Sequence, residues 1–257
     1  MSRCERRLLQ AVSAAGPKPA DGATQGVKKN WNQRLSDNLA LALAAELRER
    51  GMDGVRPAPP DHRGVSGAER RLSGGIGAKK VDVSWATEES GLIFAVSIKT
   101  IMFRDGAAGT FQKNLTNRRG DMLIEAVTLH RRFPYAVLGA FLFLDAAAES
   151  DDTNPDGTKK RRKSTFRNAF PRLRLFTGRR DPAGREEQFE TFAVILLDAG
   201  SDGSDGTAPR HPSIRAHEVN DENAAVDLDA LLDDMLELVG ERNFDLYDGT
   251  DGTITKL

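Results

Sequence analysis

Two long apolar runs place the strongest constraint on the fold of this chain. They extend from Tyr135 to Leu144 and from Phe189 to Leu197. Apolar runs of this kind are typical of strands that are covered on both faces of their sheet. The sequence therefore predicts an α/β protein in which helices flank a small central mixed β-sheet.

Further elements are predicted around these two strands. Helical patterns, most regular in the acidic C-terminal stretch, predict helices at residues 36–50, 117–132, 165–175 and 226–242 and a helical turn at 66–72. Pro171 is expected to limit or break the third of these helices. Residues 80–85 and 92–100 have strand character and are joined by a turn, which predicts a β-hairpin.

One domain is expected over residues 31–257. Residues 1–30 pass from a short amphipathic patch into a Gly-, Pro- and Ala-rich stretch, which predicts a flexible lead-in with order beginning near Trp31. Segments rich in Asp, Gly and Ser predict surface loops at 145–164 and 199–213.

The composition excludes several protein classes. The single cysteine, Cys4, cannot form an internal disulfide or a thiolate metal site. No apolar run approaches the roughly 20 residues that a membrane-crossing helix needs, and no convincing signal peptide is present, so we expect a cytoplasmic protein. The net charge of -1 conceals ten Lys and Arg residues without an acid in 159–180, and fifteen acids against three arginines in 198–251. A polyanion would be attracted to the basic region alone.

A lysine near the end of an otherwise apolar strand indicates a site. Alternation along residues 92–100 places Ser97 and Lys99 on one face, together with Ile93 and Ala95. Burying a lysine costs free energy unless an anion accompanies it. Asp82, in the first strand of the predicted hairpin, and a phosphate would supply that charge. Carboxylates that hold Mg²⁺ beside a lysine are a common means of hydrolysing a phosphodiester.

These residues resemble the motif of the PD-(D/E)xK, or restriction endonuclease-like, nuclease superfamily. The resemblance covers about residues 66–145: Glu69 on an early helix, Asp82, the triplet Ser97-Ile98-Lys99, and the helix and strand that follow. Ser97 stands where the family has its second acid, and Glu125 on the next helix is the expected substitute. The resemblance implies a restriction endonuclease-like core, Mg²⁺ or Mn²⁺ held by Asp82, Glu69 and Glu125, and catalysis by the same acids with Lys99 and Ser97.

Each of these residues also has a purely structural interpretation. Glu69 would then cap or solvate a short helix, Asp82 would pair with a neighbouring lysine, and Lys99 would extend its ammonium from a strand end. Glu125 would be an isolated acid on a solvated helix face, and Ser97 would hydrogen-bond to backbone.

Two segments are predicted to contact nucleic acid. The first lies where the second helix is expected to begin, and its contact residues are Lys113, Asn117, Arg118 and Arg119. The second is the basic run Lys159, Lys160, Arg161, Arg162 and Lys163, for which a solvated loop is the alternative.

The functional prediction is a Mg²⁺-dependent endonuclease that cuts DNA, in restriction or anti-phage defence. Its partners would be nucleic acid and no membrane, with a second copy of the chain or a defence-complex protein as further possibilities. A catalytically inactive nucleic-acid-binding or assembly subunit with the same fold is one alternative, for which Ser97 is the reason. An RNA-cutting toxin is another.

Overall fold

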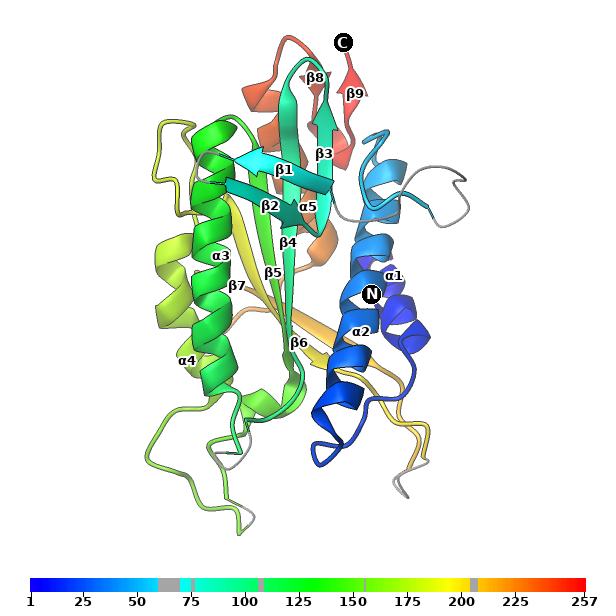
Figure 1. Ribbon diagram of the computed structural model, residues 1–257, viewed down its shortest axis with the longest axis vertical. Coiled ribbons are helices and arrows are strands. Elements are labelled where there is room, and N and C mark those ends of the chain that lie inside the picture. Colours follow the sequence, from blue (N-terminus) through cyan, green and yellow to red (C-terminus); the bar gives the residue numbers. More distant parts are fainter. Residues whose placement is uncertain (60–69, 75–76, 106–108, 155, 204–207) are drawn as a thin grey trace.

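A five-stranded mixed sheet forms the centre of the protein (Figure 1). The structure, a computed structural model, describes residues 1–59, 70–74, 77–105, 109–154, 156–203 and 208–257. The strands of the central sheet are, in spatial order, β3 (Val83–Thr87), β4 (Gly91–Ile101), β5 (Val137–Asp145), β6 (Thr191–Asp198) and β7 (Ser213–Glu218). Two small hairpins stand outside it, β1 (Arg70–Gly74) with β2 (Gly77–Val81) and β8 (Tyr247–Asp248) with β9 (Thr255–Lys256).

The sheet is parallel at its centre and antiparallel at both edges. β4, β5 and β6 run parallel, whereas β3 pairs with β4 and β7 pairs with β6 in the antiparallel direction. Every residue of β5 is buried, and β6 is buried up to its last residue. The prediction of two buried strands and of a hairpin before them is therefore confirmed.

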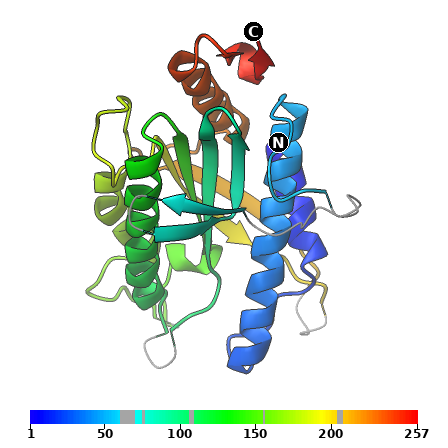
Figure 2. The ribbon, with the colours of Figure 1, turned by 45° about the horizontal axis from the view of Figure 1, so that its top comes forward.

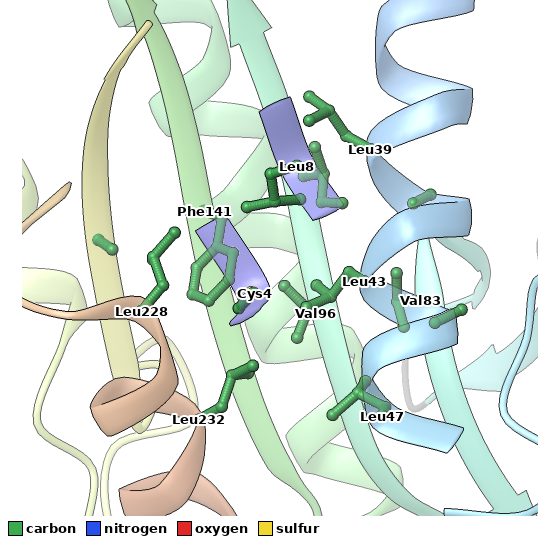
Figure 3. Close-up of a cluster of buried hydrophobic side chains, with 14 of the residues drawn as sticks. Cys4, Leu8, Leu39, Leu43, Leu47, Val83, Val96, Phe141, Leu228 and Leu232 are labelled. Atoms are coloured by element: carbon green, nitrogen blue, oxygen red, sulfur yellow. The ribbon is translucent and has the colours of Figure 1, made fainter. Parts of the chain in front are cut away.

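Helices cover both faces of the sheet (Figure 2). The helices are α1 (Arg3–Ala14), α2 (Gln25–Glu49), α3 (Gln112–Arg132), α4 (Thr165–Leu173) and α5 (Leu228–Arg242). One core lies between the sheet and α1, α2 and α5, and the other lies between the sheet and α3 and α4. In the first core, Cys4 and Leu8 of α1 lie among leucines of α2 and α5 beside Phe141 of β5 (Figure 3). The predicted α/β class, with helices flanking a mixed sheet, is confirmed.

The N-terminal segment differs from the flexible lead-in expected over residues 1–30. Ser2 caps α1 through a capping box with Glu5, and α2 begins at Gln25, eleven residues before the predicted start. The carboxylate of Glu46 on α2 lies 2.6 Å from Arg3 Nη2 and 2.9 Å from Arg7 Nε. The amphipathic patch of α1 is buried in the core, so this segment is part of the folded domain.

Two shorter elements also depart from prediction. α4 continues for two residues beyond Pro171, which it accommodates in its last turn. The helical turn expected at 66–72 ends in a strand, because Arg70 begins β1, and residues 66–69 lie outside the described residues.

A buried ionic network ties α5 to the opposite side of the sheet. Glu190 Oε1 accepts hydrogen bonds from Arg179 Nη1 at 2.9 Å and Arg242 Nη1 at 2.8 Å. Its Oε2 accepts from the Leu138 N–H at 2.7 Å and lies 3.3 Å from His130 Nε2. Burial acts to raise the pKa of Glu190, but the His130 hydrogen bond and the charges of His130 and Arg242 outweigh it and lower that pKa.

Candidate active site

The candidate site lies beside the part of β4 that extends past its hairpin partner. Pairing between β3 and β4 ends where Val83 faces Val96, and β4 continues through residues 97–101. Asp82 lies between β2 and β3 rather than within a strand. Its Oδ2 accepts a hydrogen bond of 2.6 Å from the Ile98 N–H. This bond fixes the carboxylate against the outer edge of β4.

Four predicted site residues come together at this edge. Lys99 Nζ lies 3.1 Å from Asp82 Oδ2 and 3.3 Å from Glu125 Oε2. Ser97 Oγ donates a hydrogen bond of 3.2 Å to the same Glu125 oxygen. The side chains of Asp82, Lys99 and Glu125 are 20%, 17% and 6% exposed. Two carboxylates thus share one lysine in a place that is mostly closed to water.

A β-bulge changes the facing of one residue in β4. Ile93 is predicted to share a face with Ala95, Ser97 and Lys99, but it packs on the opposite face, in the core beneath α2. The pairing register with β3 shifts at this point and leaves Ile93 as the extra residue. Alternation resumes beyond it, so Ser97 and Lys99 reach Glu125 on α3.

One buried oxygen of Glu125 accepts no hydrogen bond from the described residues. Its Oε1 is buried and has no hydrogen-bond partner within the described part of the chain. Burial raises the pKa of Glu125, and although Lys99 opposes this shift, the net pKa remains raised. Burial acts to lower the pKa of Lys99, but the charges of Glu125 and Asp82 outweigh it, so its pKa is raised and its ammonium stays charged. A buried carboxylate oxygen without a donor is a suitable ligand for a cation.

The acids that complete a metal site are not all within the described residues. Glu69 lies outside them. Among the described residues no three His, Cys, Asp or Glu side chains gather into a metal-binding group. Asp121, one turn before Glu125, is exposed and pairs with Arg118 at 3.2 Å instead of joining the cluster. Asp82 and Glu125 are therefore the candidate metal ligands that the described structure brings together.

A basic cleft of about 510 Å³ lies at the C-terminal end of β4, and none of the four cluster residues is among its described lining residues. The first half of α2, residues 100–105 after the site and the start of α3 line it, and among its described lining residues five cations accompany a single carboxylate, Asp105. The cations are Lys28, Lys29, Arg104, Lys113 and Arg118. Thr100, next to Lys99 on β4, belongs to the lining, as does Arg118, two helical turns before Glu125.

The α2 side of this cleft was not predicted, although the sequence contains a signal for it. Gln25, Lys28, Lys29, Asn32, Gln33 and Ser36 all line the cleft. They recur at intervals of three and one residues, which is one face of a helix. Three of the six lie in residues 1–30, which were expected to be flexible, and only Ser36 lies in the predicted helix 36–50, so the stripe was not recognised.

The predicted contact residues on α3 occupy different positions from those expected. α3 begins at Gln112, with buried Phe111 and Leu115 anchoring its first turn, so Arg118 and Arg119 lie inside the helix and not at its N-terminus. The Lys113 N–H, in the first turn, donates to Asp105 Oδ2 at 2.8 Å. Arg118 lines the cleft, whereas the guanidinium of Arg119 lies over the ring of Phe176 at 5.1 Å. Asn117 is exposed and does not belong to the cleft lining that the structure describes.

The second predicted basic segment lies elsewhere. Residues 159–163 line a separate depression with Arg167 of α4 and Arg215 of β7, and this depression shares no described lining residue with the cleft. The two segments predicted to contact nucleic acid therefore belong to two surfaces.

Comparison with protein-family models, curated proteins and solved structures finds no match to this chain. Among the described residues, no helix combines the length and apolarity that crossing a membrane requires.

Proposed function

We propose that this protein is a metal-dependent nuclease of the PD-(D/E)xK type that hydrolyses phosphodiester bonds in DNA, with restriction or anti-phage defence as its role. The observation that carries the proposal is the Asp82–Lys99–Glu125 cluster beside β4, the strand whose C-terminal end leads into a cleft lined by five cations. The order of hairpin, helix and parallel strand around the cluster agrees with a restriction endonuclease-like core.

The donor set fits a divalent cation. Asp82 and Glu125 would hold Mg²⁺ or Mn²⁺, and the unsatisfied Oε1 of Glu125 is the natural ligand atom. Glu69 is proposed as a third ligand on the resemblance alone. When bound, the metal would neutralise charge on the scissile phosphate and polarise it.

The chain's own side chains have distinct parts in this mechanism. The Lys99 ammonium, held between two carboxylates, donates hydrogen bonds that orient the attacking water and stabilise charge on the phosphate oxygens. Ser97 Oγ orients the Glu125 carboxylate through its hydrogen bond. The small exposed fractions of these groups limit the water around the reaction, which strengthens their charge interactions.

The cleft is suited to the sugar–phosphate backbone. Lys28 is largely buried in it, and its Nζ donates to the Asp21 carbonyl at 3.0 Å without a carboxylate partner in the described structure. Lys29, Lys113 and Arg118 add positive charge on both walls. Phosphate contacts from such cations position a nucleic acid without reading its sequence.

A catalytically inactive binding subunit is the second candidate, and Ser97 favours it. The Ser97 hydroxyl stands where the resembling family has an acid, which removes one possible metal ligand. On this alternative the cleft binds nucleic acid and no strand is cut.

Cleavage assays distinguish the two candidates. Supercoiled plasmid, single-stranded DNA and RNA are incubated with wild type, Lys99→Ala and, as matched control, Lys256→Ala, in Mg²⁺, Mn²⁺ or EDTA. Lys256 lies on β9, outside the cluster and the cleft. We expect metal-dependent cutting of DNA that is lost in Lys99→Ala and kept in Lys256→Ala. Intact substrates with every metal, despite tight binding, would establish the inactive subunit, and cutting of RNA alone would identify a ribonuclease.

A further inference from the structure

A second cationic surface lies on the β7 side of α4, away from the cleft, and we propose that it is an accessory site for the phosphodiester backbone of a nucleic acid. We call it the basic depression; residues 159–163, Phe166, Arg167, Arg215 and His217 line it. The proposal does not depend on cleavage, because it concerns binding at a surface separate from the candidate active site.

Charge is the first observation. Among the described lining residues of the basic depression, seven are Lys or Arg and three are acidic: Glu149, Asp152 and Glu222. The space they enclose is about 730 Å³, larger than the 510 Å³ of the cleft. An excess of cations around an open space attracts a polyanion and releases its counterions on binding.

Hydrogen bonds and an ion pair hold the loop that carries the basic run. The buried carboxylate of Asp151 accepts a hydrogen bond of 2.8 Å from the Thr165 N–H and lies 3.4 Å from Arg162 Nη1, which ties the two ends of the loop together. Within the loop, the Lys160 N–H donates to the Asp152 carbonyl at 2.6 Å. The loop therefore presents its cations from a backbone that these bonds hold in place.

Three of these cations have no anionic partner among the residues that the structure describes. The side chains of Arg161, Lys163 and Arg167 are on exposed residues and make no hydrogen bond or ion pair with the described part of the chain. Arg215 is held in place, since its Nη2 lies 2.6 Å from Glu149 and its Nε donates to His217 Nε2 at 3.2 Å. Burial, and then Arg215, lower the pKa of His217, which keeps the ring neutral and able to accept this bond.

The surface chemistry favours a phosphate backbone over a protein segment. Among the described lining residues only Phe166 and Ala225 are apolar, and Phe166 is buried against Phe170 and His217. A bound peptide would meet few apolar side chains, whereas phosphodiester contacts need only cations and polar groups.

Salt-dependent binding tests the proposal. A labelled DNA duplex and a labelled single strand are titrated in EDTA, at several salt concentrations, with wild type and the triple variant Arg161→Gln, Lys163→Gln, Arg167→Gln. The matched control changes three exposed cations elsewhere, Arg6→Gln, Arg180→Gln and Lys256→Gln, for the same loss of charge. We expect the triple variant to bind about tenfold more weakly and its logarithmic salt slope to fall by roughly two to three, while the control changes much less.

Two results would overturn the accessory site. One is a triple variant that binds DNA with the affinity and salt slope of the control. The other is a triple variant that binds DNA normally but no longer binds one of two other anions. Lost binding of poly-glutamate would assign the surface to an acidic protein segment, and lost binding of inorganic tripolyphosphate would assign it to a free oligophosphate. Because the readout is binding in EDTA, failure of the nuclease proposal in the cleavage assay leaves this result interpretable.

Discussion

Glu190→Gln gives a stringent test of the buried ionic network. The Glu190 side chain is 1% exposed, and its partners Arg179 and Arg242 are 1% and 4% exposed. Glutamine keeps the size of the side chain but removes the charge that compensates two buried guanidinium groups. Removing one partner of a buried ion pair costs about 3–5 kcal/mol of unfolding free energy. For a chain of this size that corresponds to a fall in Tm of roughly 6–20 °C.

Urea unfolding followed by circular dichroism measures the difference, with Glu186→Gln as the matched control. Glu186 pairs with Arg131 at 2.8 Å, but the two side chains are 38% and 51% exposed, so its loss is expected to cost less than ~1 kcal/mol. If Glu190→Gln also lowered the unfolding free energy by less than ~1 kcal/mol at neutral pH, the reasoning would be refuted.

The difference in unfolding free energy between wild type and Glu190→Gln should change with pH in one direction. The pKa of Glu190 is lowered in the folded protein, so its contribution to stability is fully present above the ordinary glutamate pKa of 4.5. It is lost as the pH falls through the lowered value, because the carboxylate is then protonated in both states. The gap between wild type and Glu190→Gln should therefore close in acid, and a gap that widened there would contradict the assigned shift.

Two further predictions concern the site and the C-terminal segment. Glu125→Gln should abolish metal-dependent cleavage while changing the unfolding free energy by less than ~1 kcal/mol. The raised pKa of Glu125 means that folding disfavours its ionised form, and Lys99 keeps Asp82 as an anionic partner in the variant. Asp121→Asn, on the exposed side of α3, should retain activity in the same assay. Gly51→Ala should lower the unfolding free energy, measured in urea, by about 2 kcal/mol or more. The φ of Gly51 is +89°, and a Cβ there would lie 2.1 Å from the Ile254 carbonyl oxygen. An unchanged urea midpoint would show that the C-terminal segment moves aside freely.

The centre of the fold could be predicted because its signals are local. The apolar runs around Phe141 and Val194 can bury all of their side chains only in a strand that is covered on both faces of its sheet. The leucines of α5 recur at helical spacing. β7 was missed because its burial is mixed and Ser213 and Arg215 are exposed; only pairing with β6 makes it a strand. α1 and the first eleven residues of α2 were missed because the Gly- and Pro-rich connection between the two helices resembles a linker.

Part of the candidate site could likewise be predicted from local sequence signals, and part could not. The pairing of Lys99 with an anion follows from the cost of burying an amine, and Glu125 follows from the helical period of α3. The cleft depends instead on the packing of α2 against the sheet opposite α3, which brings Lys28 and Lys113 to one opening although 85 residues separate them in sequence. No local pattern contains that information.

The hydrogen bond from the Ile98 N–H to Asp82 also has a part in the folding of β4. β4 runs past the end of β3, and Ile98 is only 3% exposed, so neither a strand partner nor bulk water replaces Asp82 as the acceptor of this N–H. A buried backbone donor that loses its acceptor costs about 1–3 kcal/mol of stability. The residue proposed to hold the metal therefore also completes the backbone hydrogen bonding of the strand that carries Lys99, so the unfolding free energy must be measured in any Asp82 variant before its loss of activity is attributed to chemistry.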